Sequence, residues 1–212
     1  MGGIDKPNAT LQTLEALSEL TNDKPVITVL LSPKAPHYKI VKQFCEENSC
    51  WVTHIDFVAN MSKLMLSHDV AIGAPGTTSW ERACLGMPSI IVPLADNQIT
   101  ISEQLVRSSA AIKVSINKIS TNLLTAYHTM MCSWHSMRLA NLSICDGLGV
   151  FRVTESINQL MNDNLNLVTL RPANQSNIKQ VYDWQLLPAT RKYALNKELP
   201  TWDGHQIWMK AK

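Results

Sequence analysis

Residues 70–98 read VAIGAPGTTSWERACLGMPSIIVPLADNQ, and this stretch decides the fold. Val70-Ala71-Ile72 predicts a strand, followed by a glycine loop and a helix that ends near Gly86. After Pro88 the chain continues as Ser89-Ile90-Ile91-Val92, a short apolar run typical of a buried strand. Two strands joined by a helix are the unit from which a parallel sheet is built.

The same alternation extends in both directions along the first 165 residues. Pro7-Asn8 opens a helical pattern whose apolar face is Leu11, Leu14, Leu17 and Leu20, and Val26–Leu31 predicts a strand buried on both faces. Further helices are expected near 38–48, 60–67, 98–107, 120–140 and 150–162, and further strands at 51–55 and 111–114. The sequence therefore predicts an α/β, Rossmann-like fold with one parallel sheet and helices on both faces, which binds ligands at the carboxyl ends of its strands.

Composition narrows the class of protein. The 212 residues are 45% hydrophobic and 17% charged, typical of a folded globular chain. A net charge of +2 gives no reason to expect nucleic acid or a membrane as a partner, and we find neither a membrane-spanning run nor a secretory signal. The five cysteines follow no zinc-ligand spacing, so we expect reduced thiols, mostly in the core, a cytoplasmic location and no metal.

The pattern changes near Leu167. Residues 167–170 predict a strand, 177–186 a helix and 190–196 an extended piece. We therefore expect two parts, a domain at 1–165 and a segment at 166–212. The second part is too short for an independent core.

A first candidate loop is Gly2-Gly3-Ile4-Asp5-Lys6-Pro7-Asn8, directly before a helix. Glycines allow close approach to a ligand, and the amino end of a helix offers free N–H groups to a phosphate. The alternative is a turn in which Asp5 or Asn8 caps the helix. No strand precedes the glycines, so we expect the chain to begin within a larger protein.

A second candidate loop, Gly73–Glu81, runs from a strand into a helix. Here a phosphate could lie against Gly76, Thr77 and Thr78. The carboxylate of Glu81 could accept hydrogen bonds from both hydroxyl groups of a ribose. The alternative is a capping box between Thr78 and Glu81, which have the required spacing. Both roles are compatible.

A third candidate loop, Pro93–Gln98, follows a buried strand. The amides of Asn97 and Gln98 can both donate and accept hydrogen bonds, which suits sugar hydroxyl and acetamido groups. The alternative is a turn with an Asn cap. All three loops are expected at one edge of the sheet.

Three motifs together resemble a known family. GAPGTTSWERACLGMPSIIVPLADNQ at 73–98, GGIDKPN at 2–8 and DGLG at 146–149 are similar to segments of the UDP-sugar hydrolases of pseudaminic acid synthesis, PseG-like proteins with spore-coat SpsG relatives. The resemblance covers about residues 1–162. It implies a glycosyltransferase-B architecture, in which two Rossmann-like domains hold the ligand between them. More distantly, the chain resembles the UDP-GlcNAc transferase of peptidoglycan synthesis.

The resemblance also implies roles for individual residues. It assigns the diphosphate to Gly2, Gly3, Gly76, Thr77 and Thr78, the ribose to Glu81, the sugar to Asn97 and Gln98, and the uracil to the segment from Val58 to Met61. Asp5 and Asn8 complete the expected UDP-sugar site as part of the first loop.

Members of this family hydrolyse UDP-2,4-diacetamido-2,4,6-trideoxy-β-L-altrose without metal or cofactor. Their catalytic histidine lies in a glycine-rich loop of the amino-terminal domain, and no segment of this sequence matches that loop. The resemblance therefore implies that this chain binds the nucleotide weakly, lacks catalytic residues and has the missing amino-terminal domain as its partner. The alternatives are a glycosyltransferase of the same architecture and a non-catalytic nucleotide-sugar-binding module.

The tail resembles a different family. The segments 170–173, 181–184, 188–191 and 205–208 are similar to the opening of a GNAT acetyltransferase that modifies an amino sugar. Acetyl-CoA would be a ligand only of a complete GNAT domain, whose glycine-rich loop would come later in the chain. The alternative is a helical extension that packs on the sheet.

Overall fold

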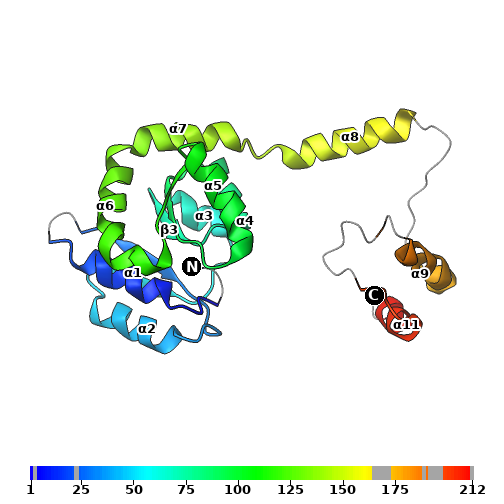
Figure 1. The fold of residues 1–212 in the computed structure, drawn as a ribbon, viewed down its shortest axis with the longest axis horizontal. Coiled ribbons are helices and arrows are strands. Elements are labelled where there is room, and N and C mark those ends of the chain that lie inside the picture. The colour runs from blue at the N-terminus through cyan, green and yellow to red at the C-terminus, as the bar shows by residue number, and fades with distance from the viewer. Residues whose placement is uncertain (2–3, 22–23, 164–172, 188–189, 191–197, 211–212) are drawn as a thin grey trace. The chain divides into compact units, whose positions relative to one another are not determined.

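The computed structural model describes residues 1, 4–21, 24–163, 173–187, 190 and 198–210 (Figure 1). They belong to two compact units, Met1–Arg152 and Val153–Lys212. This division precedes the predicted boundary at residue 165, which lies outside the described residues. The physical reason is that residues 149–161 of the connecting helix are all exposed and add nothing to the first core.

The first unit alternates helices and strands as the sequence predicts. Its first half contains α1 (Ala9–Ser18), β1 (Ile27–Leu30), α2 (Tyr38–Glu47), β2 (Val52–Ile55), α3 (Met61–Leu66) and β3 (Ala71–Gly73). Its second half contains α4 (Thr77–Cys84), β4 (Ser89–Ile91), η1 (Asp96–Gln98), α5 (Ile99–Arg107), β5 (Ala111–Lys113), η2 (Ile116–Lys118), α6 (Ile119–Cys132) and α7 (Trp134–Ile144). The helical pattern at 120–140 is two helices, because the chain leaves helical geometry at Ser133.

The strands form two parallel sheets, not the single sheet that the sequence predicts. One sheet has the order β1-β2 and the other β3-β4-β5. Among the described residues no strand pairs with the remaining edge of β1 or of β3, and this divides the sheet. The α/β class and the parallel pairing are confirmed.

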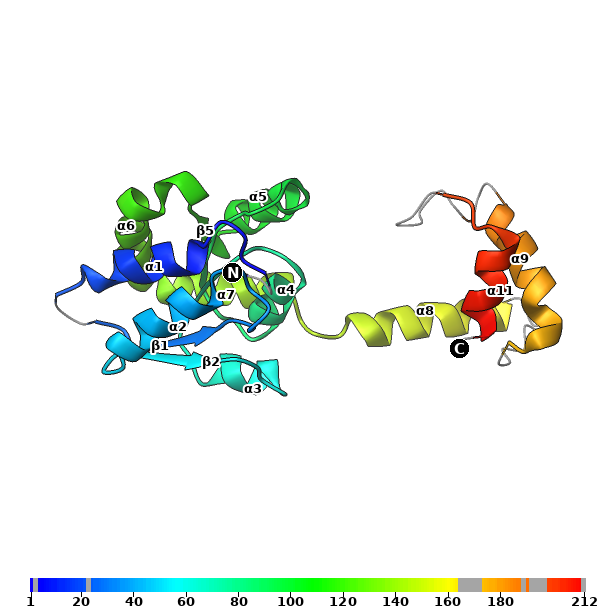
Figure 2. The same ribbon diagram turned by 90° about the horizontal axis from the view of Figure 1, so that it is seen from below.

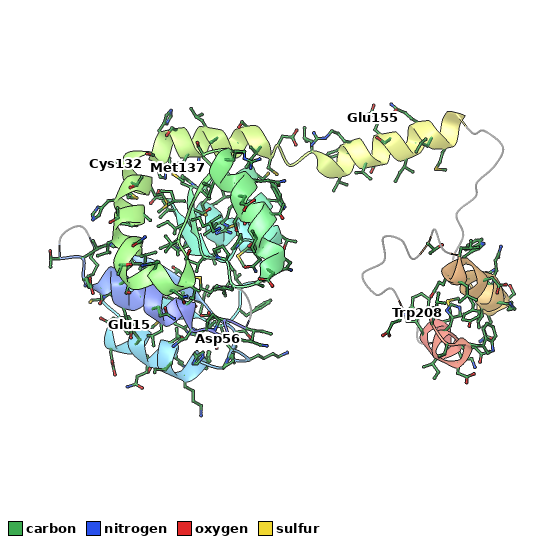
Figure 3. All side chains as sticks on the ribbon, viewed as in Figure 1. Glu15, Asp56, Cys132, Met137, Glu155 and Trp208 are labelled. Carbon is green, nitrogen blue, oxygen red and sulfur yellow. The ribbon has the colours of Figure 1, made fainter. Side chains whose placement is uncertain are left out.

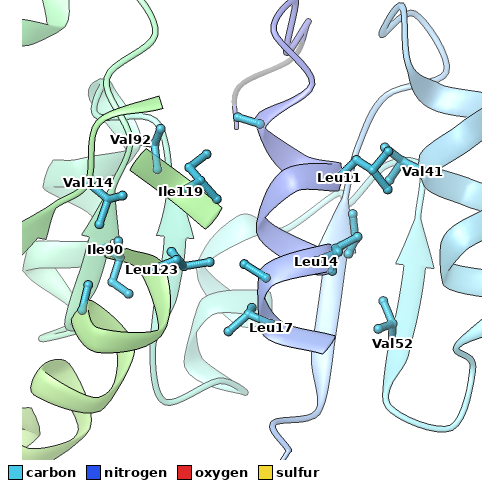
Figure 4. Close-up of a cluster of buried hydrophobic side chains, with 14 of the residues drawn as sticks. Leu11, Leu14, Leu17, Val41, Val52, Ile90, Val92, Val114, Ile119 and Leu123 are labelled. Atoms are coloured by element: carbon cyan, nitrogen blue, oxygen red, sulfur yellow. The ribbon is translucent and has the colours of Figure 1, made fainter. Parts of the chain in front are cut away.

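Helix α1 joins the two sheets through a common core (Figure 4). In this view the strands of both sheets run toward the top and α1 runs back down between them. Leu14 and Leu17 are 2% exposed and belong to one cluster that also contains residues of β1, β2 and β4. The apolar face predicted from the leucine spacing is therefore confirmed, and it positions the start of α1 at the carboxyl ends of the strands.

Burial differs between the strands. All three residues of β4 are buried, whereas β1 and β3 are mostly half-buried. The prediction that Val26–Leu31 is buried on both faces is wrong: Val26 is 80% exposed and lies outside the strand. The difference follows from position, since β4 has a neighbour on each side and β1 and β3 have one each.

Two details fix the ends of the helices near the site. Gly86 ends α4 with a φ of +66°, and a Cβ there would meet Leu142 of α7 at 2.9 Å. On α7, Met137 lies in the core, whereas Cys132 at the end of α6 is exposed (Figure 3).

Only Cys45 of the five free cysteines is buried, so the expectation that most of them fill the core is wrong. None of the helices in the described part of the chain is long and apolar enough to cross a membrane.

The second unit contains most of α8 (Gly149–Asp163), together with η3 (Gln175–Asn177), α9 (Ile178–Leu186) and α11 (Trp202–Lys210). Helices α9 and α11 lie side by side in both views (Figure 1 and Figure 2). His205 of α11 is 2% exposed, and its Nε2 lies 2.9 Å from the carbonyl oxygen of Ile178. The predicted helix at 177–186 is confirmed, whereas the strand at 167–170 and nearly all of the extended piece at 190–196 lie outside the described residues.

Candidate functional site

The candidate loops gather at the carboxyl ends of the parallel strands. The loops after β3 and β4 leave neighbouring strands, and the loop that ends at Asn8 enters α1 at the same edge. His37, which follows β1, connects to that loop, since its Nε2 lies 3.0 Å from the carbonyl oxygen of Lys6. The predicted gathering of the loops at one edge is therefore what the structure shows.

At the start of α1, an internal carboxylate occupies the helix end. Asp5 is 4% exposed, and its two oxygens accept hydrogen bonds from the N–H groups of Ala9 (2.9 Å) and Thr10 (2.8 Å). The structure thus gives Asp5 the capping role that the sequence allowed. Since Asp5 is buried and both its oxygens are bonded, a phosphate would meet a negative charge here.

Asn8 adjoins this cap. It has a left-handed φ of 57°, a conformation that Asn tolerates better than most residues. Its Oδ1 is buried and has no hydrogen-bond partner in the described part of the chain. Gly2 and Gly3 lie outside the described residues, so the diphosphate role that the resemblance gives them stays a prediction.

At the start of α4, the helix end is open. The N-cap is Gly76, whose carbonyl oxygen accepts from the Ser79 N–H (2.9 Å) and whose own N–H points to Ser79 Oγ (3.3 Å). The proposed capping box between Thr78 and Glu81 is therefore wrong. The helix begins at Thr77, which moves Thr78 inside the first turn and places Ser79 where a capping partner sits.

The first turn of α4 has unused hydrogen-bond donors. The N–H groups of Thr77 and Thr78 have no acceptor among the described residues. Thr77 is exposed and Thr78 half-buried. A Cβ placed on Gly76 would have nothing within 4 Å, so there is free space above the loop. Glu81 follows one turn later, exposed to solvent.

A buried cation lies beneath this loop. Arg82 is 4% exposed, and its guanidinium donates to Ser79 Oγ (2.9 Å) and to the carbonyl oxygens of Ala74 (3.3 Å) and Thr78 (3.3 Å). It pairs with no carboxylate in the described residues. Burial lowers the pKa of Arg82 to about 10, partly offset by nearby Glu81. The group is therefore charged at neutral pH, and its positive charge, only partly offset by Glu81, lies beside the first turn of α4.

The loop after β4 is shaped by one of its own amides. Gln98 Oε1 accepts a hydrogen bond from the N–H of Leu94 (2.8 Å), which folds the loop onto η1. Asn97 is exposed, and it caps no helix: Ala95 precedes η1 and Gln98 precedes α5. The alternative of an Asn cap is wrong, and Asn97 is the more accessible of the two amides.

The segment expected near uracil follows β2. Val58 and Met61 are half-buried, and Met61 is the first residue of α3. The helix is capped by Asn60, whose Oδ1 accepts from the Lys63 N–H (3.0 Å). The predicted segment therefore lies at the carboxyl end of β2, and its contact with a base stays a prediction.

One cluster at this edge was not predicted. Tyr38 donates its hydroxyl hydrogen to Asp56 Oδ1 (2.8 Å), and His54 Nδ1 lies 3.5 Å from the same oxygen. The hydrogen bond to Asp56 raises the pKa of Tyr38. His54 Nε2 is buried without a partner in the described residues. The only sequence signal was His54-x-Asp56 at the end of a strand, because Tyr38 comes from another element.

The DGLG motif has a structural role here. Arg152 donates to both carboxylate oxygens of Asp146, at 2.6 and 2.9 Å, and this pairing holds the pKa of Asp146 well below its usual range. Gly147 has a φ of +74°, and a Cβ there would lie 2.8 Å from Cys84 Sγ. The motif thus fits the chain against the end of α4.

Two other kinds of candidate site were considered, a surface hollow and a metal site. A shallow hollow of about 350 Å³ lies to the side of α4, lined by Trp80, Gln104, Leu105, Ser108 and Ile144. It contains no charged side chain. No cluster of three metal-ligating side chains occurs in the described ranges.

The fold and the site together define the class of protein. It is a parallel α/β protein in which an open helix end, with a positive charge beside it, lies at the carboxyl ends of the strands. The model of the glycosyltransferase family 28 C-terminal domain matches residues 5–141, and the chain belongs to this family.

The chain is also similar to two known proteins over most of its length. The chain is 23% identical to the spore coat polysaccharide biosynthesis protein SpsG of Bacillus subtilis, over 78% of this chain and 50% of that protein. It is 24% identical to the uncharacterized protein MJ1062 of Methanocaldococcus jannaschii, over 100% of this chain and 42% of that protein. The chain therefore spans about half the length of these relatives or less.

A solved structure shows the same fold. The crystal structure of Acinetobacter baumannii MurG matches with a TM-score of 0.58 and 18% identity, over 73% of this chain and 49% of that chain. The predicted fold, that of the carboxy-terminal domain of a glycosyltransferase-B protein, is confirmed by this match and by the family. No comparison bears on the acetyltransferase resemblance of the tail, which stays a prediction.

Proposed function

We propose that this chain is the donor-binding half of a UDP-sugar enzyme, with the nucleotide diphosphate held at the start of α4. The observation that carries the proposal is the buried Arg82, which pairs with no carboxylate among the described residues and lies beneath two N–H groups that have no acceptor there. A diphosphate would be stabilised there by the helix end and by the guanidinium. The family supports a nucleotide-sugar ligand.

The other predicted contacts fit around that anion. Glu81 is exposed on the second turn of α4, within the reach of a ribose joined to the diphosphate. Asn97 is exposed in the loop after the adjacent strand and is suited to the sugar. Val58 and Met61 follow β2, where we propose that the uracil binds.

Calorimetry with UDP, ADP, uridine and pyrophosphate tests this function. We expect UDP to bind more tightly than ADP, and both UDP and pyrophosphate to bind more tightly than uridine, because the anion contributes most of the binding free energy. Uridine binding as tightly as UDP would show that no diphosphate site exists. Equal affinities for UDP and ADP would contradict the proposal that the chain recognises the uracil base.

We further propose that the parent activity is hydrolysis of UDP-2,4-diacetamido-2,4,6-trideoxy-β-L-altrose, in which water attacks the anomeric carbon and UDP leaves. The motifs at 73–98 and 2–8 support this reading, and so does the relation to SpsG. The alternatives are transfer of the sugar to an acceptor and binding without catalysis.

Turnover in ¹⁸O-labelled water separates these alternatives. On its own, this chain should bind the UDP-sugar and release no UDP, since no catalytic residue is assigned to it. Labelled free sugar would show that the chain itself is a hydrolase. With an amino-terminal domain supplied, label in the released sugar indicates hydrolysis, and unlabelled sugar on an acceptor indicates transfer.

We also propose a cytoplasmic location and a reaction without metal or cofactor, because nucleotide sugars are made and used there by the enzymes that this chain resembles. For the tail we propose the start of an acetyltransferase. Whole-chain similarity to a relative more than twice as long is consistent with further sequence after it.

A further inference from the structure

Two neighbouring residues at the start of α2 each reach a loop at the carboxyl edge. Helix α2 packs on β2 (Figure 2). His37 Nε2 lies 3.0 Å from the carbonyl oxygen of Lys6, and it carries the hydrogen because a carbonyl oxygen only accepts. Tyr38 donates its hydroxyl hydrogen to Asp56 Oδ1 (2.8 Å), directly after β2. The start of α2 therefore connects the loop before α1 with the loop after β2.

His54 supports the same carboxylate. Its Nδ1 lies 3.5 Å from Asp56 Oδ1, and its ring meets that of Tyr38 edge to face, with the ring centres 5.4 Å apart. The other ring nitrogen of His54 is buried without a hydrogen-bond partner in the described part of the chain. The side chain of His54 is 9% exposed and that of Asp56 is 52% exposed. The carboxylate is thus held from the protein side, while half of the Asp56 side chain stays in solvent.

The loop that follows Asp56 is held at both of its ends. At the far end, Asn60 Oδ1 accepts a hydrogen bond from the N–H of Lys63 (3.0 Å). Between the two ends, the backbone N–H and C=O groups of residues 57–59 have no partner among the described residues. These groups are available to a ligand, and the geometry that they offer depends on where the two ends are held.

The hydroxyl of Tyr38 is not needed to attach α2 to the sheet. Val41 and Cys45 of the same helix are 0% and 2% exposed and belong to the main core, whereas Tyr38 is half-buried. The bond from Tyr38 to Asp56 therefore acts mainly on the loop that begins at Asp56.

We propose that Tyr38 is a positioning residue for the nucleobase, and that through Asp56 it sets the place of the backbone at residues 57–59. This inference rests on the proposed function, which puts the uracil at this segment. Tyr38 itself touches no ligand. It acts on the base and not on the diphosphate, which we place at α4. A residue that only stabilised α2 would change the binding of all ligands alike.

The variant Tyr38→Phe tests the proposal, because it removes the hydroxyl and keeps the ring against His54. Gln43→Met is the matched control, since it removes an exposed hydrogen bond to Glu47 (2.8 Å) elsewhere on α2. Calorimetry measures the affinities for UDP, ADP and pyrophosphate. We expect Tyr38→Phe to lower the UDP affinity about fivefold, to reduce the preference for UDP over ADP by a similar factor and to leave pyrophosphate unchanged. The control should change none of these affinities.

A double-mutant cycle tests whether Tyr38 acts through Asp56. Asp56→Ala should lower the UDP affinity as much as Tyr38→Phe does, and the double variant should lose no more than either single variant. Asp56→Asn keeps an acceptor oxygen for the Tyr38 hydroxyl, so it should retain most of the affinity. Losses that add up in the double variant would overturn the proposal.

A measurement without nucleotide completes the test. Order parameters from ¹⁵N relaxation should fall at residues 57–59 in Tyr38→Phe and stay constant in Gln43→Met. Unchanged order parameters, unchanged UDP affinity, or equal losses for UDP and pyrophosphate would each overturn the proposal. If the unmodified chain binds UDP and ADP equally, the uracil part of the proposed function fails instead. Lower order parameters in Tyr38→Phe would then still support the hold of Tyr38 on the segment, and equal ones would overturn it.

Discussion

Helices α1 and α4 both begin at the carboxyl edge of the sheets, but their first turns differ in charge. At α1 the buried Asp5 carboxylate takes the N–H groups of Ala9 and Thr10. At α4 the N–H groups of Thr77 and Thr78 have no acceptor in the part of the chain that the structure describes, and Arg82 lies beneath them. The carboxylate of Asp5 satisfies one helix end, and the other is where we propose that an anion binds.

This difference separates the expected roles of the two glycine loops in phosphate binding. Sequence motifs alone give them similar roles with phosphate, because each precedes a helix. The structure assigns the positive charge to the second loop and a negative charge to the first. The first loop therefore acts mainly through the fold, and the second is the anion site that we propose.

Replacing Arg82 by Met should have the largest effect. The loss of a buried charged donor is expected to weaken the binding of UDP and pyrophosphate by about 2 kcal/mol, or roughly 30-fold. The affinity for uridine should stay unchanged. Calorimetry measures the affinities. Arg82→Lys is the matched control, since it retains charge without the forked geometry, and it should recover part of the loss. A uniform loss for all three ligands would indicate damage to the fold.

Replacing Asp5 by Ala should affect stability more than binding. Loss of the cap on α1 is expected to lower the free energy of unfolding by about 1–2 kcal/mol, measured by urea denaturation. UDP affinity should change little or increase, because a negative charge is removed from the edge. Asp5→Asn, which keeps acceptor capacity on one oxygen, should lose less stability. A large fall in UDP affinity with unchanged stability would make Asp5 a ligand contact instead.

Replacing Gly76 by Ala should affect binding more than stability. Its backbone is extended at a φ of −165°, which any residue adopts, and the added Cβ meets nothing in the protein. Stability should therefore stay constant while UDP affinity falls about tenfold, or 1.4 kcal/mol, through contact with the ligand. Gly86→Ala is the contrasting variant, because its positive φ and the nearby Leu142 predict a lower melting temperature. Unchanged UDP affinity in Gly76→Ala would move the ligand away from this loop.

Replacing Glu81 by Ala should have the smallest effect. If the carboxylate binds the ribose, UDP affinity should fall by about 1 kcal/mol, or roughly fivefold, and pyrophosphate affinity should not fall. Glu103→Ala on the exposed face of α5 serves as the control for net charge. Equal changes in the two variants would exclude a specific contact by Glu81.

The sequence predicted the order of the elements because hydrophobic spacing is local. The leucines of α1 and the apolar run Ser89–Val92 each indicate their own structure. Pairing between strands is not local, so the alternation could not show that β1 and β3 have no common neighbour among the described strands. The half-burial of β1 follows from that missing pairing and not from its composition.

The geometry of the candidate site was predicted only in part, for a similar reason. The loops of Asn97 and Thr77 were found because loops that follow parallel strands meet at one edge. Arg82 was missed because an arginine inside a helix is usually exposed, whereas this one is buried with its guanidinium bonded to the loop before α4. The error at Thr78 and Glu81 arose because their spacing fits a capping box in a helix that begins two residues later.

The most direct test of the central claim compares the two helix ends in one experiment. Backbone amide resonances of the ¹⁵N-labelled chain are recorded during titration with UDP and, separately, with pyrophosphate. The account predicts that Thr77 and Thr78 shift with both ligands, while Ala9 and Thr10 stay unchanged. Shifts at Ala9 and Thr10 without shifts at Thr77 and Thr78 would contradict it.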